Sequence, residues 1–140
     1  MNNLKNEFAR FLRTERAAAA AAYAAGQADL VTALSTARAP ATFMGPGGGA
    51  VVGARRVIAN NEKAARHFAA GGKSAFKVLQ LGASDDLAFW TGWQIARVRL
   101  VGKPGLVPMK LRVTEVFRKE RGAWKLVHRH ADMLAKKGKR

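Results

Sequence analysis

The chain has 140 residues, 49% of them hydrophobic, so it is long enough and apolar enough to bury the core of a single domain. It contains no cysteine, which excludes disulfides, a thiol nucleophile and any metal site built on thiolates. Its formal net charge of +16 at pH 7 favours solubility and attracts polyanions, but it does not indicate a fold.

The basic residues do not concentrate on one predicted element. Nucleic-acid-binding proteins usually gather cations on one face, whereas here the only cluster is in the last five residues, 136–140. We therefore interpret the charge as a solvated basic surface and keep nucleic-acid binding as an alternative. No apolar run approaches the roughly 18 residues of a membrane span, and the alanine tract at 17–22 is typical of a helix. These features predict a cytoplasmic protein with no membrane contact.

The first half of the chain predicts three helices. Apolar residues at three- and four-residue spacing predict a long helix over 3–25, and shorter patterns predict helices over 29–36 and 53–70, the last ended by Gly71 and Gly72. The inner stripes are Leu4, Phe8, Leu12, Glu15, Ala19 and Tyr23 in the first helix, Leu30, Val31 and Leu34 in the second, and Val57, Asn61, Ala64 and Phe68 in the third.

A short strand over 41–44 and a glycine-rich loop over 45–49 separate the second and third helices. The loop lacks the Gly-Lys-Ser/Thr ending of a phosphate-binding loop, so we interpret it as a flexible turn.

The second half of the chain predicts antiparallel strands. The runs 74–83 and 87–101 are followed by a hairpin over 109–133, whose charged turn contains Gly122. Both faces of the strand over 87–101 are apolar, so alternation does not determine which of them points inward. Alternation in the hairpin predicts two inward-facing sets, Val113, Glu115 and Phe117 in the first arm and Trp124, Leu126, His128 and His130 in the second.

Polar groups on these inward faces are the candidate site. If Arg121-Gly122 is a two-residue turn, Glu115 lies directly opposite His128, although a bulge would break this parity. A buried carboxylate needs a partner, so such a pair serves structure or chemistry. His130 extends the same face, and the three groups have the composition of a facial metal triad, which we do not predict.

Helices followed by an antiparallel meander predict an α+β domain over residues 1–134, with a disordered basic tail at 135–140. A curved sheet wrapped around helices encloses a cone, whose open end makes a pocket.

The order of elements, the Gly45-Pro-Gly-Gly loop and the ending Trp124-Lys-Leu-Val-His-Arg-His130 resemble the nuclear transport factor 2-like superfamily. The ending is close to its SnoaL-like and ketosteroid-isomerase-like branches, and it is similar to the association domain of calcium/calmodulin-dependent kinase II. The resemblance covers residues 5–133 and implies a conical, cystatin-like fold that dimerises through the sheet. It does not imply one reaction, because the superfamily contains enzymes, binders and assembly domains.

The catalytic residues of ketosteroid isomerase, a base Asp and an oxyanion hole of Tyr and protonated Asp, are only partly matched. The resemblance places the base at Gly45 and the tyrosine near Ala19, with Tyr23 one helical turn further on, and the second acid on or next to Glu115. Steroid isomerisation by that mechanism is therefore not predicted.

Three interpretations of the site remain. Glu115 and His128 act as an acid–base pair in an isomerase, dehydratase or cyclase, or they orient a small ligand of apolar or mixed polarity without turnover, or they form a structural pair. The expected ligand-binding residues are Tyr23, Phe43, Phe68, Trp93, Phe117 and His130, with no cofactor.

Overall fold

The structure, a computed structural model, describes residues 3–133. Its helical elements are α1 (Asn3–Phe11), the π-helical turn η1 (Leu12–Arg16), α2 (Ala17–Ala24), α3 (Asp29–Leu34) and α4 (Ala54–Ala65). Its strands are β1 (Thr42–Met44), β2 (Val51–Val52), β3 (Phe68–Ala83), β4 (Leu87–Leu100), β5 (Val107–Glu120) and β6 (Ala123–Met133). The predicted tail at 135–140 lies outside the described residues.

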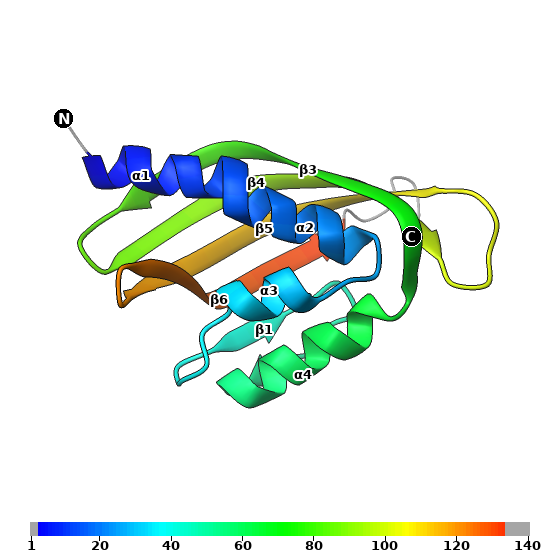
Figure 1. Ribbon diagram of the computed structural model, residues 1–140, viewed down its shortest axis with the longest axis horizontal. Coiled ribbons are helices and arrows are strands. Elements are labelled where there is room, and N and C mark those ends of the chain that lie inside the picture. Colours follow the sequence, from blue (N-terminus) through cyan, green and yellow to red (C-terminus); the bar gives the residue numbers. More distant parts are fainter. Residues whose placement is uncertain (1–2, 134–140) are drawn as a thin grey trace, which may run out of the picture.

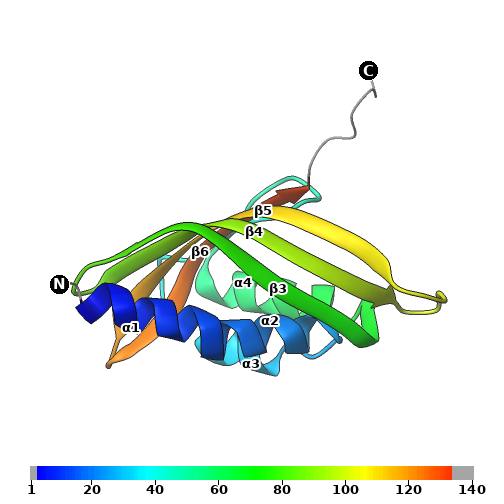
Figure 2. The ribbon, with the colours of Figure 1, turned by 90° about the horizontal axis from the view of Figure 1, so that it is seen from above.

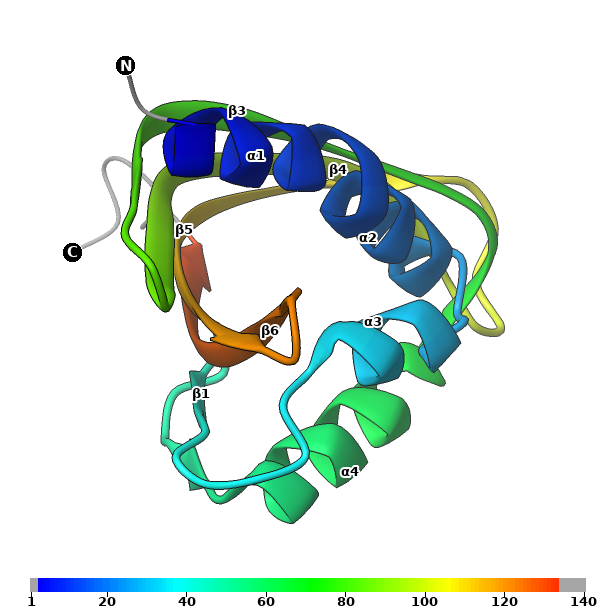
Figure 3. The ribbon, with the colours of Figure 1, turned by 60° about the vertical axis from the view of Figure 1, so that its left-hand side comes forward.

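The strands form one curved six-stranded sheet in the order β2-β1-β6-β5-β4-β3. Consecutive strands from β3 to β6 are antiparallel, and β1 joins the edge of β6 in parallel. The sheet arches over the helices, which all lie on its concave side (Figures 1 and 2). Figure 3 shows α1 and α2 inside the curve of the sheet, with α3 and α4 below them. The predicted α+β cone is confirmed.

An aromatic cluster fills the narrow end of the cone. Phe8 and Phe117 are fully buried, with ring centroids 5.3 Å apart in an edge-to-face contact. Trp124 packs edge-to-face on Phe8 at 5.5 Å, and Phe11 contacts Phe117 at 5.3 Å. Such offset pairs add to the area that the rings bury. The cluster therefore fixes α1 against β5 and β6 and leaves the wider end of the cone less filled.

The long first helix differs from its predicted inner stripe at Glu15. A π-helical turn over Leu12–Arg16 inserts one extra residue into the helical repeat, so the buried side advances by one position. Arg16 is consequently buried, and Glu15 is exposed. The prediction for Glu15 was therefore wrong, and a cation occupies the inner stripe instead. In α3, Leu30 was also wrongly placed on the buried side, since it is 49% exposed.

The third predicted helix is shorter than its pattern indicated. Helix α4 ends at Ala65, and β3 begins at Phe68 and runs through Gly71 and Gly72. These glycines do not end a helix. A Cβ on Gly72 would lie 2.1 Å from the carbonyl oxygen of Ala24, so the missing side chain lets α2 pack directly on β3.

Candidate functional site

A β-bulge in β6 determines which residues of the hairpin face the cone. The Arg121-Gly122 turn has positive φ at both residues, and Glu120 pairs with Ala123, as the two-residue turn predicted. Phe117 pairs with Leu126, but Val116 pairs with His128, so Val127 is an extra residue in β6. Every later residue of β6 is shifted by one position relative to a regular hairpin.

The shift places Arg129, not His128, opposite Glu115. The predicted Glu115–His128 pair is therefore wrong. His128 has its Nδ1 atom 2.7 Å from the Thr42 hydroxyl oxygen on β1, and burial together with His130 lowers its pKa.

The side chain of His130 is 51% exposed, and its Nε2 atom lies 3.7 Å from Asp132. The facial triad is likewise not formed, and no group of three or more metal-binding side chains gathers within residues 3–133.

Glu115 is fully buried at the centre of a network of nitrogen donors. Arg16 donates from Nε to Oε1 at 2.9 Å and from Nη2 to Oε2 at 2.7 Å. Trp90 Nε1 donates to Oε1 at 2.8 Å, and Arg129 Nη1 donates to Oε2 at 2.6 Å. The two-pronged contact with Arg16 is the fork geometry in which a guanidinium binds a carboxylate most strongly.

This network keeps Glu115 ionised. Burial by itself would raise the pKa of its carboxyl group, but the charges and hydrogen bonds of Arg16 and Arg129 outweigh burial and lower the pKa to about 2. A carboxylate with this pKa does not exchange protons near neutral pH, so Glu115 is not suited to acid–base catalysis. It is the counter-ion that allows two guanidinium groups to be buried.

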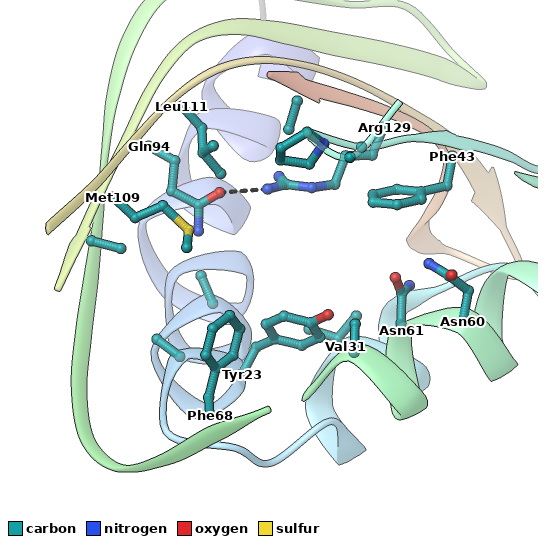
Figure 4. Close-up of a pocket in the computed structure, with 18 of the residues that line it drawn as sticks. Tyr23, Val31, Phe43, Asn60, Asn61, Phe68, Gln94, Met109, Leu111 and Arg129 are labelled. Atoms are coloured by element: carbon teal, nitrogen blue, oxygen red, sulfur yellow. Dashed lines mark hydrogen bonds between the residues drawn. The ribbon is translucent and has the colours of Figure 1, made fainter. Parts of the chain in front are cut away.

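A cavity of about 390 Å³ adjoins this network at the wide end of the cone, between the sheet, α2 and α4. Its lining comes from the concave face of the sheet, from α2, α3 and α4, and from the glycine-rich loop 45–49, which reaches it between β1 and β2. Figure 4 shows Phe43 and Phe68 on its wall, with Arg129, Gln94, Tyr23 and Asn61 bringing polar groups to it.

Three of the predicted ligand-binding residues line the cavity, namely Tyr23, Phe43 and Phe68. Trp93 does not, because β4 turns Trp90 and Ala96 inward and Trp93 outward, where Lys110 lies 4.5 Å above its ring. Phe117 belongs to the aromatic cluster at the narrow end, as described above.

Sequence reasoning missed the polar lining residues Arg16, Gln94, Asn61 and Arg129. A signal was available only for Asn61, which the helical periodicity had placed on an inner stripe.

The polar groups of the cavity are partly committed to one another. Arg129 Nη2 donates to Gln94 Oε1 at 2.6 Å, and Gln94 Nε2 donates to the Ser74 hydroxyl at 2.9 Å. Burial raises the pKa of Tyr23, although Arg129 and Arg16 oppose the shift, so its hydroxyl is neutral and able to donate. The cavity thus combines apolar walls with a few polar groups, the usual composition of a small-molecule site.

The loop position that carries the base in ketosteroid isomerase has no side chain here. Gly45 lines the cavity, and a Cβ at this position would lie 2.8 Å from the ring of Phe43. A carboxylate at Gly45 would therefore require Phe43 to move. Ala19, near which the resemblance placed the oxyanion tyrosine, is fully buried in the core. The catalytic side chains of ketosteroid isomerase are therefore missing at both Gly45 and Ala19.

The model of the SnoaL-like domain family matches residues 14–136, so the chain belongs to this family. No match was found among curated proteins. No helix within residues 3–133 has the length and apolar character needed to cross a membrane.

Solved structures of the NTF2-like superfamily share the fold. A superfamily protein from Salmonella enterica serovar Typhimurium is 15% identical with a TM-score of 0.77, and 96% of this chain and 94% of that one are covered. An NTF2-like protein from Streptomyces avermitilis, provisionally named a dehydratase, is 17% identical with a TM-score of 0.74 over 94% and 99% of the two chains. A provisionally named calcium/calmodulin-dependent protein kinase type II association domain from Thiobacillus denitrificans is 18% identical with a TM-score of 0.68, covering 88% and 94%. Further similar structures have a cystatin-like fold.

Proposed function

We propose that this protein binds a small molecule in the cavity at the wide end of the cone. The observation that carries the proposal is a space of about 390 Å³, within the range of ligand pockets, enclosed by apolar side chains and bordered by a small set of polar groups. A core packed for stability alone seldom leaves so large a space, because interiors are packed as densely as organic crystals.

Binding is favoured over catalysis by the chemistry of the lining. Among the described residues around the cavity there is no Asp, Glu, His or Lys, the side chains that most often transfer protons. The charged groups in the lining are Arg16 and Arg129, which orient and bind rather than exchange protons. We therefore do not extend the proposal to the dehydratase activity that names one structural relative.

The proposal is tested by filling the cavity. Ala64 lines it from α4, whereas Ala59 is exposed on the same helix and does not line it. The neutral fluorophore 1-aminoanthracene, which brightens in apolar pockets, serves as the probe. We expect its fluorescence to rise with the parent protein and with Ala59→Phe, and to be lost in a folded Ala64→Phe variant. Equal fluorescence in the two variants would place the probe elsewhere and contradict the proposal.

We also propose that the protein forms a homodimer through the convex face of its sheet. This face carries Ile95, which is 47% exposed, and Trp93 lies two residues before it on the same side of β4. Exposed apolar side chains gathered on one face are typical of an interaction site. The same face carries the exposed cations Lys77 and Arg112, so salt in the buffer should favour the association.

A further inference from the structure

The polar floor of the cavity carries more positive than negative charge. Arg16 and Arg129 line the cavity, and both are hydrogen-bonded to Glu115, which does not line it. Arginine stays protonated in proteins, so two positive charges face one carboxylate and one positive charge is left over. No other charged side chain is found among the described residues that line the cavity. The excess charge is therefore not neutralised from within the cavity wall.

One donor on these arginines has no acceptor. Arg16 donates to Glu115 from Nε and Nη2, but its Nη1 atom is buried without a hydrogen-bond partner. The side chain is only 4% exposed, and it lines the cavity. Leaving a buried charged donor unpaired costs the full desolvation free energy of that group. Native structures usually satisfy such atoms, so this one indicates an acceptor that occupies the cavity.

Glu115 already supplies its full negative charge, because its network holds it ionised across the neutral range, so it offers no further compensation. Water screens the excess only in part, because Glu115 is fully buried and the side chains of Arg16 and Arg129 are only 4% and 16% exposed. An uncompensated charge in such a place is expensive unless a counter-charge is bound beside it. The acceptor that fits is therefore an anion rather than a neutral group.

The remaining lining describes the rest of the ligand. Phe43, Phe68, Val31 and Met109 supply apolar wall, and the neutral hydroxyl of Tyr23 and the amide of Asn61 supply polar contacts away from the arginines. A ligand charged at several positions would bring its other charges against apolar wall. A single carboxylate matches the one excess charge, and its two oxygens match the donor geometry of a guanidinium.

We propose that the cavity binds amphipathic monocarboxylates, with the carboxylate at Arg16 Nη1 and Arg129 and the apolar body toward Phe68 and Phe43. This inference rests on the proposed ligand-binding function and specifies its ligand class. The carboxylate takes the place of a second counter-ion, so the two guanidinium groups face two anions in the bound state. A neutral amide of the same shape can accept a hydrogen bond from Arg16 Nη1 but leaves the excess charge uncompensated, and a cation adds repulsion.

The test compares ligands that share a body and differ in their head group. Two matched sets are titrated by isothermal calorimetry at pH 7, namely 4-phenylbutyrate, 4-phenylbutanamide and 4-phenylbutylamine, and octanoate, octanamide and octylamine. We expect each acid to bind about tenfold or more tightly than its amide, and each amine to bind most weakly. Acid and amide of equal affinity would overturn the carboxylate inference and leave the ligand-binding proposal standing. The absence of binding by all six would overturn both.

Variants locate the anion. Arg16→Met keeps most of the side-chain length and removes the guanidinium, while Arg129 remains to pair with Glu115. The preference for acid over amide should disappear in Arg16→Met and persist in Arg13→Met, an exposed position on the same helix. A preference that persists in folded Arg16→Met would overturn the assignment.

A second measurement needs no variant. Lowering the pH of the parent protein from 7 to 5 should leave the acid bound, and its affinity should fall only as the ligand's own carboxyl group becomes protonated, near pH 4–5 for simple acids. The amide should bind independently of pH over the same range. If the acid's affinity did not follow its ionisation, the anionic head group would not be what the cavity recognises.

Discussion

Replacing Glu115 by glutamine removes the single negative charge that holds the centre of the cone together. The glutamine is nearly the same size, so packing is preserved, but Arg16 and Arg129 lose their shared counter-ion. Removing one partner of a buried ionic group costs about 3–5 kcal/mol, because the remaining charges stay buried and uncompensated. The fourth donor, Trp90 Nε1, still finds a carbonyl oxygen to accept its bond, so its contribution is largely retained.

The loss is measured by urea unfolding followed by tryptophan fluorescence, at one fixed protein concentration so that the proposed dimerisation does not alter the comparison. With an m-value of about 2 kcal/mol/M, a loss of this size lowers the unfolding midpoint by roughly 1.5–2.5 M. Asp132→Asn is the control, because that carboxylate forms an exposed ion pair with Arg112 and should change stability by less than about 1 kcal/mol.

Two outcomes would refute this reasoning. A Glu115→Gln variant whose midpoint matches that of the control would mean that the buried network adds little to stability. The double variant Glu115→Gln/Arg129→Gln should be more stable than Glu115→Gln alone, because one uncompensated guanidinium has been removed. A double variant that is still less stable would show that the loss comes from packing rather than charge.

Three further outcomes follow from the structure. The pKa of Glu115 is lowered from 4.5 to about 2, so the stability that its ionised form provides is complete above pH 4.5 and is lost as the pH falls toward 2. In urea titrations over this window, ionisation of Glu115 should account for a fall of about 3 kcal/mol in the free energy of unfolding of the parent. Glu115→Gln should lack that part of the fall. His128→Gln should change the affinity for 1-aminoanthracene by less than about twofold, because His128 is hydrogen-bonded to Thr42 and does not line the cavity. A tenfold loss of affinity would show that His128 belongs to the binding site. Ile95→Glu should convert the proposed dimer to a monomer in light scattering, whereas Val52→Glu, at a valine on β2 that is more exposed than Ile95, should not. Two variants that both stay dimeric would move the interface elsewhere.

The fold was predictable because its signals are local or topological. The Arg121-Gly122 turn is specified by two adjacent residues, and alternation in β5 correctly turned Val113, Glu115 and Phe117 inward. The resemblance to the NTF2-like superfamily supplied the cone, which no single element reveals.

The partners of Glu115 were not predictable because each depends on a one-residue shift. The π-helical turn moves the buried position from Glu15 to Arg16, and the bulge at Val127 turns Arg129 inward in place of His128. A shift of one residue in a strand exchanges its two faces. Alternation counted from the residues before the bulge therefore assigned the residues after it to the wrong face of the sheet. Arginine on an apolar stripe also looks like an error in the pattern unless its counter-ion on a distant strand is known.

Gly71 and Gly72 show the same limit in another form. A glycine pair at the end of a helical pattern normally stops the helix, but here it lies inside β3, where α2 approaches the backbone. Gly72 lacks a side chain where Ala24, far away in the sequence, contacts it, and Gly71 adopts a positive φ of 105°. Nothing in the local sequence distinguishes this case from a helix stop.

A crystal structure with 4-(4-bromophenyl)butyrate would show whether a carboxylate ligand binds beside Arg16 and Arg129 in the cavity. Anomalous scattering from bromine locates the apolar end without reference to the surrounding side chains. We expect the bromine within the cavity near Phe68 and the carboxylate about 3 Å from Arg16 Nη1. A bromine signal outside the cavity, or a carboxylate turned away from both arginines, would contradict it.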